Sequence, residues 1–102
     1  MQDTLLTLEA ERWQWAKQIF PEATAVSSLR KAESEILEIE KDLESGQPNP
    51  EEYADAMMCL FDSAQRAGIT PEQIVEAYAL KIIKNKSRTW SKNPDNSYSH
   101  VK

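Results

Sequence analysis

The sequence predicts an all-α protein, a four-helix bundle of antiparallel helices followed by an irregular C-terminal tail. Only two of the 102 residues are glycine, which leaves little material for sharp β-turns. Apolar residues recur at spacings of three and four in four successive segments, and capping residues or prolines bound those segments. We expect a single domain over residues 1–102 and no sheet, with a tail at about 89–102 and helices at 4–19, 28–44, 50–67 and 71–87.

The first two helices have clear starting signals. Asp3 or Thr4 is suited to cap the first helix, and Pro21 follows its end because proline cannot continue a helix. Ser27 or Ser28 is suited to cap the second helix, whose apolar stripe then continues to the polar turn that follows. These signals set the boundaries of the first helical pair.

The last two helices both open on a cap followed by proline. Asn49 precedes Pro50, and Thr70 precedes Pro71, so each proline occupies the first helical position, where its missing N–H costs nothing. Gly68 lies where a left-handed residue commonly ends a helix. The sequence therefore places a short connection between the third and fourth helices.

Composition excludes several functional classes. A formal net charge of -5 argues against nucleic-acid binding, which needs a basic surface to neutralise phosphates. No apolar run approaches the roughly 18 residues of a membrane span. Cys59 is the single cysteine, so an intrachain disulfide is impossible, and its apolar surroundings predict a buried side chain. With no basic and apolar leader at the start, we expect a cytoplasmic protein.

Two acidic pairs form the principal candidate site. Glu35 and Glu38 lie three apart at the border of the apolar stripe of the second helix, and Glu52 and Asp55 lie three apart at the start of the third. That spacing puts both carboxylates of a pair on one helix face. Antiparallel helices joined by a short turn would then direct four carboxylates into one volume. Such crowding is unfavourable unless a cation is present or the side chains point into water.

The ligand type selects the metal. Carboxylate oxygens favour hard cations, so Mg²⁺ is the expected cofactor and Mn²⁺ a substitute. Di-iron bundles need histidine ligands within their helices, and the only histidine, His100, lies in the tail. A Mg²⁺ site in a small acidic protein fits phosphate chemistry, in which one of the four acids accepts a proton from the attacking water. The alternative is that these acids form a solvated face.

A basic face follows the acidic segment. Lys81, Asn85 and Arg88 recur at spacings of four and three, so they share one side of the fourth helix near its end. This arrangement suits an anionic ligand, although cations near a helix C-terminus also favour the helix dipole without any ligand. Trp90 follows this face, and together with Tyr98 and His100 it suggests a tail that docks on another surface.

These residues resemble the MazG-like, all-α nucleoside triphosphate pyrophosphohydrolase superfamily, and most closely its compact dATP/dGTP diphosphohydrolase branch. The similarity rests on the order of the two acidic pairs, the run from Glu51 to Asp62, the segment 66–70, the Lys81-x-x-x-Asn85-x-x-Arg88 pattern and Trp90. It covers roughly residues 27–90 and most of the tail.

The resemblance implies Mg²⁺-dependent hydrolysis of a nucleoside triphosphate to a monophosphate and pyrophosphate by a dimer or higher oligomer. It implies Glu35, Glu38, Glu52 and Asp55 as metal ligands, with catalytic roles for the first two. It also implies that Lys81 and Arg88 contact phosphates and that Asn85 contacts the sugar or a phosphate, and it makes Trp90 a fourth candidate substrate-binding residue. One departure is Ser34, since the family often has glutamate there, and Glu33 or Asp62 is a possible replacement.

Other readings stay open. The acidic pairs could be solvated in a non-catalytic helical interaction module, or the metal site could serve a non-nucleotide phosphoester. Three tryptophans and a nearly continuous apolar centre in the third helix predict a homodimer, because one small bundle does not readily cover so much apolar surface. One of the two neighbouring tryptophans, Trp13 and Trp15, is expected to contact something beyond the core of the first helix.

Overall fold

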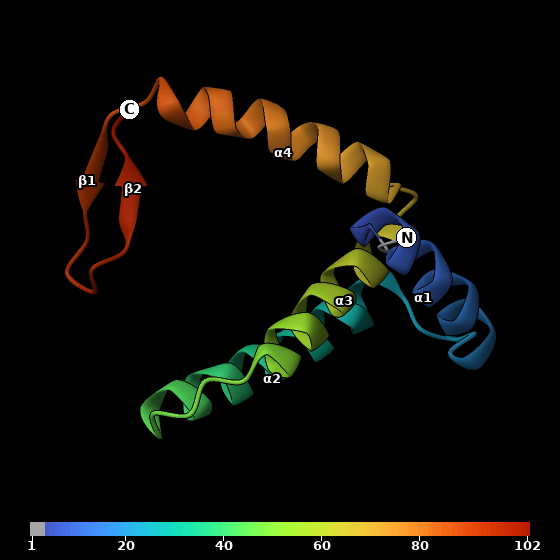
Figure 1. The fold of residues 1–102 in the computed structure, drawn as a ribbon. Coiled ribbons are helices and arrows are strands. Elements are labelled where there is room, and N and C mark those ends of the chain that lie inside the picture. The colour runs from blue at the N-terminus through green and yellow to red at the C-terminus, as the bar shows by residue number, and fades with distance from the viewer. Residues whose placement is uncertain (1–3) are drawn as a thin grey trace. The chain divides into compact units, whose positions relative to one another are not determined.

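A computed structural model describes residues 4–102 and confirms the all-α class. It contains α1 (Leu5–Ile19), α2 (Ala25–Glu44), α3 (Pro50–Arg66) and α4 (Pro71–Lys86), followed by two short strands, β1 (Trp90–Lys92) and β2 (Tyr98–His100) (Figure 1). The chain divides into two compact units, the first ending at Glu72 and the second spanning Gln73–Lys102. Over the described residues, no helix has the length and hydropathy that a membrane crossing requires.

The starts of α1 and α2 are set by threonine caps. The Thr4 hydroxyl accepts the N–H of Thr7 at 3.1 Å, whereas Asp3, the other expected cap, lies outside the described residues. α2 begins at Ala25 instead of Ser28, because Thr24 is its cap. The Ser27 hydroxyl accepts the Thr24 N–H at 2.8 Å and completes a reciprocal capping box. The prediction that a serine caps α2 was therefore wrong, since Ser27 is the inner partner of the box.

Both ends of α3 follow the sequence prediction. Asn49 is its cap and Pro50 its first residue. At the other end Gly68 has a φ of +90°, the left-handed conformation that glycine adopts without steric cost. The N–H of Ile69 then donates to the carbonyl of Ala64 at 2.9 Å, which satisfies one of the last carbonyls of the helix.

The first unit is built on the antiparallel pair of α2 and α3, which lie side by side along their length (Figure 1). α1 packs against α3. The buried hydrophobic side chains of the described chain are only Ala16 and Ala32, whereas five polar residues are buried: Glu9, Ser28, Glu35, Asp62 and Ser63. The centre of this unit is therefore largely polar.

The tail is a β-hairpin, so the prediction of an irregular tail and no sheet was wrong. β1 and β2 pair antiparallel, with Trp90 opposite His100 (Figure 1). In the connecting loop the side chain of Asp95 accepts the N–H of Ser97 at 3.0 Å, and Asn96 has a φ of +72°. Each strand has only three residues, too few for an alternating pattern to be visible in the sequence.

Candidate metal centre

Three carboxylates gather where α2 faces the start of α3. Glu35 comes from α2, and Glu52 and Asp55 come from the first turns of α3. One oxygen of each lies within 4.8 Å of the others, the only such group of potential metal ligands among the described residues. Glu35 is buried, with 9% of its surface exposed, and the other two are half-buried. The two acidic segments therefore meet as the spacing predicted.

Glu38 is not part of this cluster. It is exposed on α2, one turn beyond Glu35. Side chains three residues apart on a helix are separated by about 300° of rotation, about 60° short of a full turn. One carboxylate of such a pair can therefore face the neighbouring helix while the other points away from it. The expected border position therefore holds for Glu35 alone, and Glu38 as a fourth ligand stays a prediction.

The cluster is electrostatically crowded. The pKa of Glu52 is raised, mainly by partial burial and to a smaller extent by the negative charges of Glu35 and Asp42. Lys31 relieves part of this repulsion because its Nζ lies 3.2 Å from an Oε1 of Glu35, although the lysine side chain is 65% exposed. Three carboxylates that repel one another and offer only oxygen atoms are a donor set that fits Mg²⁺ or Mn²⁺.

We expect Glu52→Gln to raise the thermal midpoint of the metal-free protein at pH 7. The raised pKa of Glu52 means that folding disfavours its charged form, so its ionisation reduces stability at pH values above that pKa. The gain should disappear below about pH 4, where the carboxyl is protonated in both states. Circular dichroism melts in a chelator test this, with Glu51→Gln as the matched control because Glu51 is exposed in the same helical turn. A Glu52→Gln variant less stable than that control would contradict the repulsion.

A hollow of about 560 Å³ opens beside the cluster, within the first unit. Its acidic end includes Glu35 and Asp55. Its other walls come from the second half of α1, the connection that follows it, the first turns of α2 and the middle of α3. They are formed by Arg12, Trp15, Phe20, Ala23, Ser27, Ser28, Lys31, Met58, Cys59 and Asp62. Cys59 lies on this wall and is half-buried, so its burial is less than the sequence predicted.

Asp62 lines the hollow, and both of its carboxylate oxygens accept hydrogen bonds. Its Oδ1 accepts a hydrogen bond from Nη1 of Arg12 at 3.0 Å, and its Oδ2 accepts from Nε of Arg66 at 2.6 Å and from the Ser28 hydroxyl at 2.5 Å. Burial alone would raise the pKa of Asp62, but these three hydrogen bonds hold it below its usual value. Asp62 is therefore not in the cluster. Glu33, the other possible replacement, is exposed and pairs with Arg30.

The same network holds α1 against α3. Glu9 is buried and binds Arg12 through two hydrogen bonds of 2.5 and 2.7 Å. Arg66 stacks over Trp13, with its guanidinium carbon 5.4 Å from the ring centroid, and also donates to the carbonyl of Ala23 at 3.0 Å. The sequence prediction did not include this network. One signal for it was present, since Glu9 precedes Ala16 by seven residues and so shares its buried face.

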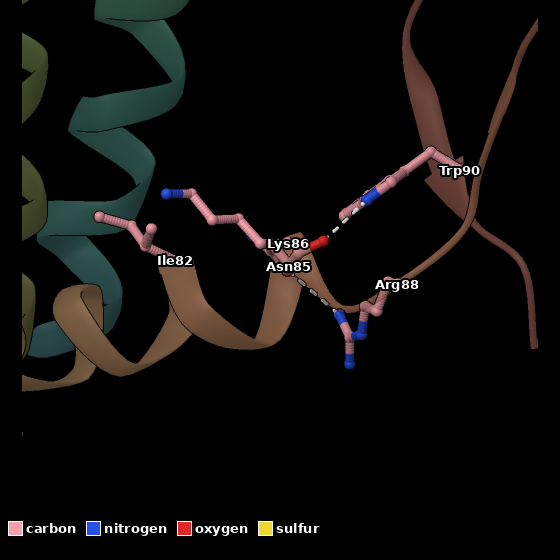
Figure 2. A pocket seen from close by; sticks show the side chains of 5 residues that line it. All are labelled: Ile82, Asn85, Lys86, Arg88 and Trp90. Atoms are coloured by element: carbon pink, nitrogen blue, oxygen red, sulfur yellow. Dashed lines mark hydrogen bonds between the residues drawn. The ribbon is translucent and has the colours of Figure 1, made fainter.

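The second unit gathers three of the four predicted substrate-binding residues. Asn85, Arg88 and Trp90 line a hollow of about 460 Å³ at the end of α4, together with Ile82 and Lys86 (Figure 2). The indole N–H of Trp90 donates to the carbonyl of Asn85 at 3.0 Å, and Nη1 of Arg88 lies 3.4 Å from the Asn85 side-chain oxygen (Figure 2). The Trp90 bond connects β1 to the last turn of α4, and the Arg88 contact connects that turn to the residues between α4 and β1.

Lys81 is the fourth of these residues and is not among those that line this hollow. It is exposed on α4, and the positive charge of Arg88 lowers its pKa. The basic face as a substrate-binding surface stays a prediction.

Comparison with known proteins identifies the family. Residues 8–102 match the family model described as dATP/dGTP pyrophosphohydrolase. The chain belongs to this family. A dATP/dGTP diphosphohydrolase of Salmonella phage PMBT28 is 34% identical over 89 residues, which cover 85% of this chain and 28% of that relative. The chain thus spans under a third of that relative's length, and the resemblance to the dATP/dGTP branch is confirmed.

A solved structure of similar fold carries ligands. The cyanophage S-2L MazG-like pyrophosphohydrolase, bound to dGDP and three catalytic Mn²⁺ ions per active site, matches with a TM-score of 0.78. The match covers 99% of this chain and 100% of that chain at 24% sequence identity. At that identity the likeness shows the fold, so this dATP/dGTP pyrophosphohydrolase family member has the MazG-like helical architecture.

Proposed function

We propose that this chain hydrolyses a deoxynucleoside triphosphate, with Mg²⁺, to the monophosphate and pyrophosphate. The observation that carries the proposal is the cluster of Glu35, Glu52 and Asp55, two of which line a hollow, in a member of the dATP/dGTP pyrophosphohydrolase family. A bound cation would offset the repulsion among these carboxylates. A cation beside a hollow of this size would in turn attract an anionic substrate.

The residues have distinct roles in the proposed reaction. Glu35, Glu52 and Asp55 would hold the metal, which when bound offsets phosphate charge and makes water a better nucleophile. Water attacks the α-phosphorus, the bond from that phosphorus to the bridging oxygen breaks, and pyrophosphate leaves. Glu38 lies one turn from Glu35 and outside the cluster, so its carboxylate is available to accept the proton of the attacking water.

The substrate-binding roles of residues in the second unit rest on the resemblance to the family. We propose that Lys81 and Arg88 stabilise charge on the phosphates and that Asn85 and Trp90 contact the nucleotide. The support is their composition, two cations beside an amide and an indole, and their position at the end of one helix. Mn²⁺ is expected to replace Mg²⁺, because both accept oxygen ligands.

A substrate panel tests the function. The chain is incubated with Mg²⁺ and each canonical or modified nucleoside triphosphate, and pyrophosphate release is measured. Release of pyrophosphate, with the monophosphate as the other product, supports the proposal. Release of inorganic phosphate only, or turnover of a simple phosphoester such as p-nitrophenyl phosphate but of no nucleotide, would replace it with a different hydrolase. Absence of any turnover and of stabilisation by Mg²⁺ would favour a helical interaction module.

We expect the chain to form a homodimer. Large apolar side chains expose more than half of their surface in both units: Trp15, Leu37 and Leu60 in the first, and Tyr78, Leu80 and Ile83 in the second. Exposed apolar area on this scale marks association surfaces. Light scattering should give twice the chain mass of 11.7 kDa. A monomeric mass at micromolar concentration would contradict this expectation.

A further inference from the structure

The carboxylate cluster depends on the register of two helices, that is, on how far α2 is displaced along α3. Glu35 comes from α2, and Glu52 and Asp55 come from α3, with one oxygen of each within 4.8 Å of the others. One turn of helix advances about 5.4 Å along its axis. A slip of one turn between the two helices would therefore separate Glu35 from at least one of the two carboxylates of α3.

Apolar packing does little to fix this register. Among the described residues of α2 and α3, Ala32 is the only hydrophobic residue that is buried. Larger apolar side chains along the pair stay exposed, among them Leu29, Ile36 and Met58. Ridges and grooves repeat along a helix, so side chains that interlock only partly can repack after a shift of one turn. A buried polar contact with a single partner does not repeat in this way and can specify the register.

A hydrogen bond of this kind joins α2 to α3. The Ser28 hydroxyl donates to Oδ2 of Asp62 at 2.5 Å, and both residues are only 8% exposed. The acceptor is a carboxylate, and charge-assisted bonds are stronger than bonds between neutral groups. Arg12 and Arg66 hold the same carboxylate, so the hydroxyl meets an acceptor of fixed position. A slip of one turn would break the bond and leave a buried hydroxyl without its acceptor.

This bond lies two turns from the cluster on both helices. Ser28 precedes Glu35 by seven residues, and Asp62 follows Asp55 by seven residues. Because α2 and α3 run antiparallel, these equal steps lead from one pair to the other within a single register (Figure 1). Seven residues span about 10.5 Å of helix, so the bond acts on the cluster at a distance, through the two helices.

We propose that Ser28 is a positioning residue: its hydrogen bond to Asp62 selects the register of α2 and α3 in which the three carboxylates of the cluster can hold one cation. The inference rests on the metal centre of the proposed function. Without the bond other registers compete, and the apparent Kd of the metal rises by the inverse of the fraction of chains in the competent register. Once bound, the cation links the two helices in that register. Loss of the bond should therefore weaken metal binding but leave the metal-saturated rate close to that of wild type.

Mn²⁺ binding measures this effect without turnover. Electron paramagnetic resonance gives the Kd of Mn²⁺ for wild type and Ser28→Ala, and pyrophosphate release is then measured over a range of Mn²⁺ concentrations. Ser28→Ala should raise both the Kd and the Mn²⁺ concentration that gives half-maximal release about tenfold. The rate at saturating Mn²⁺ should stay close to that of wild type. Ser28→Thr keeps the hydroxyl and should restore most of the Mn²⁺ affinity.

Ser63→Ala is the matched control. The Ser63 hydroxyl is equally buried and also reaches α2, but its acceptor, at 2.7 Å, is the backbone carbonyl of Ala25. Every residue has a carbonyl, so a bond to the backbone discriminates poorly between registers. Ser63→Ala should lower the thermal midpoint about as much as Ser28→Ala does, and it should leave the Kd of Mn²⁺ unchanged.

Three results would overturn the inference. The first is a Ser28→Ala variant that binds Mn²⁺ as wild type does. The second is an equal loss of Mn²⁺ affinity in Ser28→Ala and Ser63→Ala, which would show a general loosening of the helix pair. The third is a lower rate at saturating Mn²⁺ with an unchanged Kd. Failure of the proposed function is a separate result: a wild-type chain that releases no pyrophosphate, but binds Mn²⁺ more tightly than Ser28→Ala, contradicts the reaction and supports the register inference.

Discussion

Glu35→Gln should lower pyrophosphate release by about a thousandfold, because a metal centre supplies several kcal/mol of transition-state stabilisation and each 1.36 kcal/mol changes the rate tenfold. Glu35 is the most buried member of the three-carboxylate cluster and the only one from α2. Glutamine keeps the size of the side chain but removes the charge that attracts the cation. The helical circular dichroism spectrum should be unchanged, so the loss of turnover is not a loss of fold.

The control for this variant is Glu40→Gln, because Glu40 is an exposed acid on the same helix and is not in the cluster. Turnover is measured with saturating Mg²⁺ and substrate, and Mn²⁺ binding is titrated in parallel by electron paramagnetic resonance. Glu35→Gln should lose both turnover and high-affinity Mn²⁺ binding. Turnover close to that of wild type would show that these acids form only a solvated face.

Glu38→Ala in the same assay distinguishes two roles for Glu38. A variant that binds Mn²⁺ normally but turns over slowly has lost a proton acceptor, whereas one that loses Mn²⁺ binding has lost a ligand. Without metal this variant should be no less stable than wild type, since removing an acid near the cluster cannot increase repulsion. Normal turnover would remove Glu38 from the site.

The helical framework was predictable because local signals determine it. Prolines and the asparagine cap of α3, together with Gly68, act within one turn of the chain, so their sequence positions are sufficient evidence. The meeting of Glu35 with Glu52 and Asp55 was also predictable, since a short connection forces α2 and α3 to run antiparallel. Glu38 shows where spacing stops being informative: a helix face is broad, and the neighbouring helix decides which part of it is buried.

The rest depends on contacts between segments far apart in the sequence. The bonds from Arg12 and Ser28 to Asp62 span 50 and 34 residues, and no local pattern encodes such pairs. The sequence analysis therefore contained no prediction that Glu9 and Asp62 are buried in a polar centre of the first unit. The hairpin was missed for a different reason, because two three-residue strands show no periodicity and only the turn residues between them are informative.

Asp62→Ala should destabilise the fold by about 3–5 kcal/mol, because it leaves Arg12 and Arg66 buried without their shared partner. Both arginine side chains are nearly buried, with 12% and 10% of their surface exposed. One terminal nitrogen of Arg66 already lacks a hydrogen-bond partner, so this side chain has little capacity to compensate. Domains of this size have a total stability of roughly 5–15 kcal/mol, and the variant is therefore expected to be partly unfolded near physiological temperature.

Urea denaturation at pH 7 measures this loss against Glu33→Ala, which removes an exposed ion pair and should change stability by no more than about 1 kcal/mol. The difference between wild type and Asp62→Ala should also depend on pH. The pKa of Asp62 is lowered in the folded state, so its contribution is complete above its unfolded pKa of about 4 and is lost as the pH falls through the folded value. A pH-independent difference, or a loss as small as that of Glu33→Ala, would show that the network contributes packing and not charge pairing.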